Sequence, residues 1–190
     1  MIDPSRRVLL LDRDGVLNRD RPDYVKSPEE LIVLPGVPEA MARLHAAGVI
    51  CLLVTNQAAI AKGIISFEIL GSIHARLFRA IEEAGGRITQ VYLCPHRNED
   101  RCGCRKPRSG NILRAQQDWG FDPARTWMVG DAQRDYLAAR GAGCNGAIVC
   151  SGHEAAWVKE LPQVPVFDNL PRFVDAYLSD DPRFSSTTDR

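Results

Sequence analysis

Short apolar runs alternate with amphipathic stretches along most of the chain, and this alternation is the strongest constraint on its fold. Each run is too short for a helix and apolar on both faces, which is typical of a strand buried in a parallel sheet. We expect strands at Val8–Leu11, Val49–Val54, Ile88–Leu93, Thr126–Val129 and Gly146–Cys150. We expect helices at Pro38–Ala47, Ser66–Ala84, Ser109–Trp119 and Gln133–Ala142. The sequence therefore predicts an α/β fold, with a Rossmann-like parallel sheet covered by helices on both faces.

The ends of two helices carry typical capping signals. Ser66 and Ser109 are expected to cap the amino termini of their helices, and Gly120 is expected to end the second of them. In the helix that follows Ser66, four apolar residues spaced four apart are expected to form its buried side. They are Ile69, Ile73, Leu77 and Ile81.

The length of 190 residues suits one domain, which we place at residues 1–178. Between Glu154 and Leu178 the pattern is helical at its start and end but is interrupted by three prolines. Residues 179–190 are polar and are expected to form a disordered tail. No insertion is large enough to form a separate cap domain.

The formal net charge is zero, so no overall field would draw the chain to nucleic acid or to an anionic membrane surface. The apolar runs are far shorter than a membrane span requires, and no apolar signal segment precedes Val8. We therefore expect a cytoplasmic monomer with neither nucleic acid nor a membrane among its partners.

Two carboxylates follow the first expected strand, at the end where open α/β sheets bind ligands. They belong to Asp12 and Asp14, and Gly15 allows the chain to turn sharply after them. Such close like charges repel unless a cation lies between them, and Mg²⁺ prefers oxygen ligands of this kind. One carboxylate can then act as a nucleophile and the other as a general acid and base.

Three further polar groups stand near the ends of other expected strands. They are Thr55-Asn56-Gln57, Arg105-Lys106-Pro107, and Gly130-Asp131 with Asp135. Hydroxyls, amides and cations can bind phosphate oxygens, while Asp131 can complete an oxygen cage for the metal with Asp135 behind it. Taken singly, each group is equally typical of a turn, a helix cap or a solvated surface. Together they indicate transfer of a phosphoryl group.

A cysteine cluster lies just before these cations. Cys94, His96, Cys102 and Cys104 are close in sequence, and without an export signal they indicate a metal site rather than disulfides. A Cys₃His set leaves no open position, which is typical of structural zinc. The zinc would pin the loop 94–107 and so fix its cations. We expect Cys51, Cys144 and Cys150 in the core and His45, His74 and His153 on the surface.

The order Asp-Arg-Asp-Gly-Val-Leu-Asn, Thr-Asn-Gln, Arg-Lys-Pro and Gly-Asp-x-x-x-Asp resembles the haloacid dehalogenase (HAD) superfamily of phosphatases over nearly all of residues 7–150. The string from Cys94 to Pro107 is similar to its branch of heptose bisphosphate and histidinol phosphate phosphatases. The resemblance implies a HAD-like fold without a large cap. It also implies a phosphoric monoester hydrolase that uses Mg²⁺ and acts on a small phosphorylated metabolite.

By this resemblance, Asp12 attacks phosphorus and forms an aspartyl phosphate, while Asp14 protonates the leaving group and then activates water. Thr55 and Lys106 would hold the phosphoryl group. Mg²⁺ would be bound by Asp12, Asp131 and the backbone carbonyl of Asp14. For this chemistry Asp14 must hold a proton near neutral pH, and a nearby phosphate dianion would raise its pKa.

The string Thr55–Gly63 resembles the heptose enzymes and implies cleavage of the C7 phosphate of D-glycero-D-manno-heptose 1,7-bisphosphate. The short span from His96 to Cys102 does not favour this choice, and histidinol phosphate is the alternative. Ala132 stands where many relatives have Lys. A non-catalytic zinc module that binds phosphate or a partner is the alternative of another class. Without a cap, loops must hold the substrate, and the candidate contacts are Asn18, Asp20, Tyr24, Asn56, Gln57 and Arg105.

Overall fold

The computed structural model of the chain describes residues 7–151, 158, 163–179 and 184. Its centre is a six-stranded parallel sheet in the order β3-β2-β1-β4-β5-β6. The strands are β1 (Val8–Leu11), β2 (Ile50–Asn56), β3 (Gln90–Cys94), β4 (Trp127–Gly130), β5 (Asn145–Val149) and β6 (Val166–Phe167). The predicted parallel sheet is confirmed. The sequence pattern missed β6, because two residues are too few to show a strand period.

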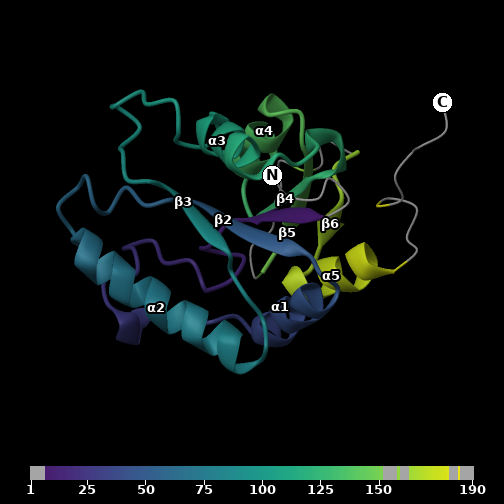
Figure 1. Cartoon of the computed structure of the whole chain (residues 1–190). Helices are drawn as coiled ribbons and strands as arrows, with labels where there is room; N and C mark the ends of the chain where they lie inside the picture. The colour runs from purple at the N-terminus through teal and green to yellow at the C-terminus, as the bar shows by residue number, and fades with distance from the viewer. Residues whose placement is uncertain (1–6, 152–157, 159–162, 180–183, 185–190) are drawn as a thin grey trace.

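Five α-helices cover the two faces of the sheet. They are α1 (Val37–Ala46), α2 (Phe67–Glu83), α3 (Gly110–Trp119), α4 (Gln133–Gly141) and α5 (Leu170–Leu178), with 3-10 turns η1 (Pro28–Glu30) and η2 (Pro123–Arg125). Figure 1 shows α1, α2 and α5 on one face and α3 and α4 on the other. Residues of β1 alternate between the two cores: Leu9 and Leu11 face the first helix group, and Val8 and Leu10 face the second.

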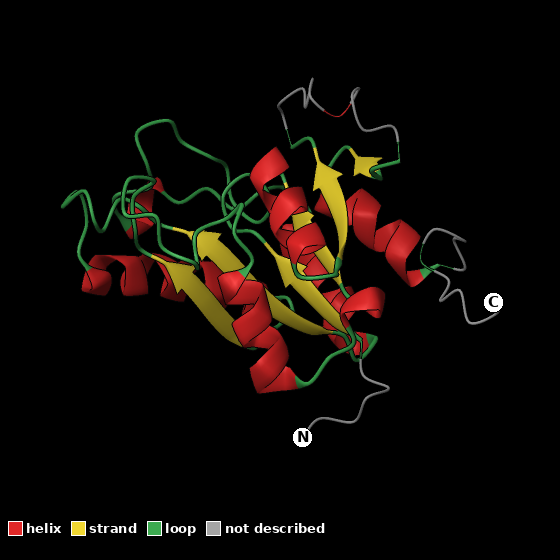
Figure 2. Ribbon diagram, turned by 90° about the horizontal axis from the view of Figure 1, so that it is seen from above, coloured by secondary structure: helices red, strands yellow, loops and turns green. Residues whose placement is uncertain are grey.

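The site-bearing loops are gathered at one edge of the sheet. From the central β1 the chain builds β2 and β3 to one side, then returns to build β4, β5 and β6 on the other. Open α/β sheets bind ligands where the strand order reverses in this way. Leu11 of β1 is in register with Val129 of β4, so the residues after these two strands meet. Figure 2 shows the central strands pointing into this group of loops.

Both serines stand at the helix starts, but only one caps its helix. The Ser66 hydroxyl accepts a hydrogen bond from the Ile69 amide at 3.2 Å, as expected. The Ser109 hydroxyl instead donates to the Ala138 carbonyl at 2.9 Å and ties α3 to α4. The expectation that its side chain caps α3 was therefore wrong. Gly120 ends α3 with a φ of 64°, as predicted.

The buried side of α2 differs from the predicted stripe. Ile73, Leu77 and Ile81 are buried as expected, but Ile69 is 39% exposed, because residues four apart drift around a helix of 3.6 residues per turn. Leu70 takes its place. His74, expected on the surface, is also buried, since it lies on the same side of the helix as Leu70 and Leu77.

The carboxyl-terminal part of the chain is described only in pieces. The start of the interrupted helical segment and His153 lie mostly or wholly outside the described residues, whereas its end forms α5. The predicted disordered tail also lies outside them, except for Ser179 and Phe184. The Phe184 ring packs against Trp127 at 4.7 Å and against Phe173 at 5.4 Å between centroids.

Within residues 7–151, only loops and short turns connect β1 to α1 and β2 to α2, so no large cap covers the sheet edge. In the part of the chain that the structure describes, no helix combines the length and apolar character needed to cross a membrane.

Candidate active site

Three carboxylates meet where β1 and β4 end. Oxygen atoms of Asp12, Asp131 and Asp135 all lie within 4.8 Å of one another. Burial, together with the neighbouring charges of Asp12 and Asp135, raises the pKa of Asp131 to about 7. Burial raises the pKa of Asp12 to about 6, although Lys106 opposes the shift. A cation here would relieve the repulsion, so the cluster has the character of a metal site.

Two glycines leave room for the carboxylates of this cluster because they carry no side chains. Gly15 has a φ of +77°, and a Cβ atom there would lie 2.1 Å from Oδ2 of Asp131. A Cβ atom on Gly130 would lie 2.1 Å from Cβ of Asp135. Side chains at either position would therefore displace an acidic residue of the cluster.

Lys106 is buried against the same carboxylates. Its Nζ atom lies 2.8 Å from Oδ1 of Asp12 and 2.7 Å from Oδ1 of Asp135, and it donates to the Val54 carbonyl at 2.7 Å. Burial disfavours its charge, but the two carboxylates outweigh this effect and raise the pKa of Lys106. The Asn56 side chain donates to the Lys106 carbonyl and accepts from its amide, both at 3.1 Å. Asn56 therefore holds the lysine backbone in place.

Asp14 lies apart from the acidic cluster and has its own set of donors. Arg13 donates to both of its oxygens, at 2.8 and 2.9 Å from Nη2, while Asn18 donates at 2.9 Å and Gln57 at 2.8 Å. Burial raises the pKa of Asp14, but Arg13 and these donors hold it below its usual value. These contacts favour the ionised form of Asp14, whereas the chemistry expected of it requires a proton near neutral pH. That a phosphate dianion would restore the proton stays a prediction.

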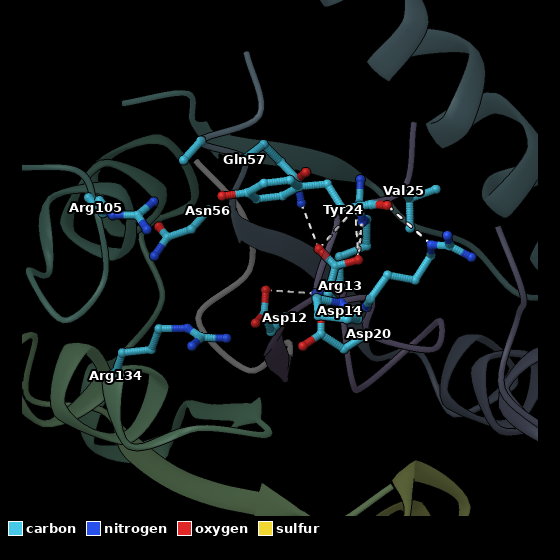
Figure 3. A pocket seen from close by; sticks show the side chains of 13 residues that line it. Asp12, Arg13, Asp14, Asp20, Tyr24, Val25, Asn56, Gln57, Arg105 and Arg134 are labelled. Atoms are coloured by element: carbon cyan, nitrogen blue, oxygen red, sulfur yellow. Dashed lines mark hydrogen bonds and ion pairs between the residues drawn. The ribbon is translucent and has the colours of Figure 1, made fainter. Parts of the chain in front are cut away.

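A pocket of about 250 Å³ opens above Asp12 and Asp14. Five of the six predicted substrate contacts line it: Asp20, Tyr24, Asn56, Gln57 and Arg105. Asn18 does not, because it is fully buried and directed at Asp14. Thr55 and Lys106 are also buried, and the Thr55 hydroxyl accepts a hydrogen bond from Gln57 at 3.0 Å. Figure 3 shows Arg105 and Arg134 on the same side of the pocket.

Three residues of this site were not singled out in the sequence. Arg13 was part of the quoted motif but was given no role, although an arginine between two aspartates is itself a signal for an ion pair. Arg134 lines the pocket, and its Nη2 atom lies 3.6 Å from Oδ1 of Asp131. His74 is 3.4 Å from Arg13. Its place one helical turn after Leu70 could have indicated burial.

The predicted metal-binding loop brings its four residues together. Cys94 Sγ lies 3.7 Å from both His96 Nδ1 and Cys102 Sγ, and Cys104 Sγ lies 3.3 Å from His96 Nδ1. This Cys/His cluster could hold a metal ion. Arg105 is tied to the loop, because it donates to the His96 carbonyl at 3.2 Å. Cys51 and Cys144 are buried in the core as expected, whereas Cys150 is half-buried.

Known proteins resemble this chain in both sequence and structure. A family model described as HAD-hydrolase-like matches residues 103–173. The D-glycero-beta-D-manno-heptose-1,7-bisphosphate 7-phosphatase of Pseudomonas aeruginosa is 39% identical over 92% of this chain and 99% of its own length. The enzyme of the same name from Neisseria meningitidis is 37% identical over 88% and 92%.

A solved structure gives the same likeness. The D,D-heptose 1,7-bisphosphate phosphatase of B. bronchiseptica, complexed with magnesium and phosphate, superimposes with a TM-score of 0.84. It is 36% identical in sequence, and the match covers 90% of this chain and 98% of that one. The likeness thus extends over almost the whole fold, including the strands and loops that form the site.

Proposed function

This chain belongs to the family of D-glycero-beta-D-manno-heptose-1,7-bisphosphate 7-phosphatases, and we propose that it hydrolyses the C7 phosphate of heptose 1,7-bisphosphate through an aspartyl phosphate on Asp12. The observation that carries the proposal is the meeting of Asp12, Lys106 and Asp131 where β1 and β4 end. Nucleophile, cation and metal-binding carboxylates are the parts that phosphoryl transfer needs.

In the first step, a carboxylate oxygen of Asp12 forms a bond to phosphorus. The bond between phosphorus and the C7 oxygen breaks, and its electron pair stays on that oxygen. The oxygen takes a proton from Asp14, which holds it because the bound phosphate dianion raises its pKa, and Asp14 becomes ionised. Lys106 and the Thr55 hydroxyl offset and orient the charge of the transferring group. The dephosphorylated heptose can then leave.

In the second step, ionised Asp14 takes a proton from water as the water oxygen bonds to phosphorus. The bond between phosphorus and the Asp12 oxygen breaks, which returns the carboxylate and releases inorganic phosphate. The donors from Arg13, Asn18 and Gln57 favour the ionised form of Asp14, and this is the form the second step requires.

The acidic cluster suits Mg²⁺. Oδ1 of Asp131 is buried without a hydrogen-bond partner among the described residues, and carboxylate oxygens are ligands that Mg²⁺ prefers. Asp12, Asp131 and the Asp14 carbonyl would hold the ion, with Asp135 behind them. When bound, it would neutralise charge on the phosphate oxygens and lower their repulsion from Asp12.

The cluster Cys94, His96, Cys102 and Cys104 suits zinc, because four sulfur and nitrogen ligands complete a closed tetrahedral site. The role of the ion would be structural. It would fix a loop that has no regular secondary structure and whose end supplies Arg105 and Lys106.

The phosphate that remains on the heptose needs its own cation. Arg105 and Arg134 both line the pocket and lie on one side of it, away from Asp14 (Figure 3). Arginine can contact phosphate through two parallel hydrogen bonds. These two residues would therefore favour a bisphosphate over a monophosphate.

The decisive experiment compares kcat/KM for heptose 1,7-bisphosphate and histidinol phosphate, in the wild type and in Asp12→Asn. We expect the wild type to prefer the heptose at least tenfold, which is about 1.4 kcal/mol of transition-state binding, and the variant to be inactive. A tenfold preference for histidinol phosphate would mean that the proposed substrate is wrong. Unchanged hydrolysis by Asp12→Asn would mean that Asp12 is not the nucleophile. Failure of the wild type on every phosphate ester would favour a non-catalytic binding module.

A further inference from the structure

We propose that His74, on α2 and outside the polar groups at the strand ends, is a positioning residue for Asp14 that acts through Arg13. The inference rests on the proposed function, since it assigns a role within the same hydrolysis. A sequence of contacts carries it from α2 to the pocket: Phe78 to His74, His74 to Arg13, and Arg13 to Asp14.

The first contact fixes the imidazole. His74 is buried, and its ring stacks on Phe78 with 5.6 Å between centroids and 25° between planes. The ring lies on the side of α2 that faces the core, so both helix and stacking partner restrict its orientation. Its Nε2 atom faces Nη1 of Arg13 at 3.4 Å.

The second contact restricts the orientation in which the Arg13 guanidinium meets Asp14. The guanidinium is 1% exposed, so its N–H groups must find protein partners. With Nη1 directed at His74, the Nε and Nη2 groups remain, and both donate to Asp14, at 3.1 and 2.8 Å. Because the guanidinium is planar, the imidazole that fixes its orientation also fixes how its other N–H groups meet the Asp14 carboxylate.

His74 can accept a hydrogen bond in this place. Burial and the adjacent charge of Arg13 lower the pKa of His74 to about 4, so the ring is neutral near neutral pH. A neutral imidazole has one nitrogen that accepts and one that donates. Acceptance at Nε2 would match the donor on Arg13.

The effect of losing the His74 contact should depend on the leaving group of the substrate. Asp14 must reach the C7 oxygen to protonate it, and small displacements of a catalytic group cost rate steeply. An alkoxide needs this proton, whereas p-nitrophenolate is stable without it. Loss of the His74 contact should therefore slow formation of the aspartyl phosphate from a sugar phosphate more than from p-nitrophenyl phosphate.

The test uses His74→Leu, which removes the acceptor, and His74→Gln, which keeps an acceptor at similar reach. We expect His74→Leu to lower kcat/KM for heptose 1,7-bisphosphate about tenfold and kcat/KM for p-nitrophenyl phosphate less than threefold. The ratio kcat/KM is compared because it reports formation of the aspartyl phosphate and not its hydrolysis, which is common to both esters. His74→Gln should recover most of the loss. Leu77→Val, at another buried position of α2, controls for general damage to the helix, and thermal unfolding of each variant checks the fold.

Equal losses of kcat/KM on the two esters, no recovery in His74→Gln, or the same selectivity in Leu77→Val would overturn the role of His74. None of these outcomes would affect the proposed function, which depends on wild-type turnover and on inactive Asp12→Asn. If the wild type prefers a different alkyl phosphate, the proposed substrate is wrong, and the same comparison with that ester still decides the role of His74.

Discussion

The Lys106 ammonium lies 2.8 Å from the Asp12 carboxylate, and both side chains are almost completely buried. Asp12 directly follows β1 and Lys106 stands at the end of the cysteine loop, so the two residues are far apart in sequence. A second contact, at 2.7 Å to Asp135, places the ammonium between two acids that would otherwise repel each other. Lys106 thus stabilises the ionised nucleophile and the loop arrangement together.

Replacing this lysine should therefore affect both rate and fold. We expect Lys106→Met to lower kcat/KM by at least about 100-fold, the usual cost of one electrostatic contact to the reacting group. It should also lower the melting temperature, because Asp12 and Asp135 lose their buried partner. Steady-state kinetics and thermal unfolding measure the two effects. Arg87→Met, at an exposed cation away from the pocket, should leave both nearly unchanged, and a comparable loss there would argue against a specific role for Lys106.

Gly15→Ala tests the space beside Asp131. Its Cβ atom would meet Asp131 Oδ2, whereas Gly63, with a similar φ of +68°, has no atom within 4 Å of such a Cβ. Both substitutions carry the left-handed backbone cost of about 1–2 kcal/mol, so Gly63→Ala is a matched control. We expect only Gly15→Ala to raise the Mg²⁺ concentration needed for half-maximal activity, by about tenfold or more. Equal Mg²⁺ dependence in the two variants would mean that Asp131 can move aside.

The sequence predicted the sheet, its main helices and which strand-end groups would lie close together, because apolar runs and strand-end polar groups are local patterns. What it could not predict depends on burial and distance. Arg13 and His74 become functional candidates only because the loop after β1 contacts α2. Asn18 was predicted to contact the substrate, but the fold buries it against Asp14. Asn56 lines the pocket as predicted, and its further contact with the Lys106 backbone could not be read from the sequence. The ion pair between Arg13 and Asp14 was not predicted for the same reason, and the proton on Asp14 in the presence of phosphate stays a prediction.

The acidic cluster should make the effect of Mg²⁺ on stability depend on pH. Asp12 and Asp131 have pKa values of about 6 and 7, raised from 3.8, so without metal the folded state holds protons that the unfolded state releases. Metal-free stability should therefore fall between about pH 4 and pH 7. Mg²⁺ should offset this loss, on the order of 2 kcal/mol.

Thermal unfolding with and without Mg²⁺ at pH 5 and pH 8 checks this expectation. The increase in melting temperature should be larger at pH 8 by roughly 4–8 °C. In Asp131→Asn the pH dependence of the increase should shrink, because the carboxyl group with the higher pKa is gone. An equal increase at both pH values in the wild type would mean that the cluster does not bind the ion.

Removing a ligand from the cysteine cluster should affect substrate binding as well as metal content. Cys104→Ser should lower bound zinc, measured by mass spectrometry of the metal, and should raise KM, because the loop that orients Arg105 loses its anchor. Cys150→Ser, at a half-buried cysteine outside the cluster, should retain zinc and KM. Zinc loss without any change in KM would mean that the ion contributes to stability but not to substrate binding.

Arg105→Ala should distinguish a bisphosphate from a monophosphate substrate. The arginine lines the pocket, and the Asn98 side chain and the His96 carbonyl hold its guanidinium at 2.9 and 3.2 Å. If it contacts the phosphate that is not cleaved, its loss should raise KM for heptose 1,7-bisphosphate by about tenfold or more, the usual worth of a charge-assisted contact. KM for a sugar monophosphate should change much less. Arg87→Ala, at an exposed arginine away from the pocket, should alter neither value, and equal increases for both substrates in Arg105→Ala would assign the residue to the fold of the loop instead.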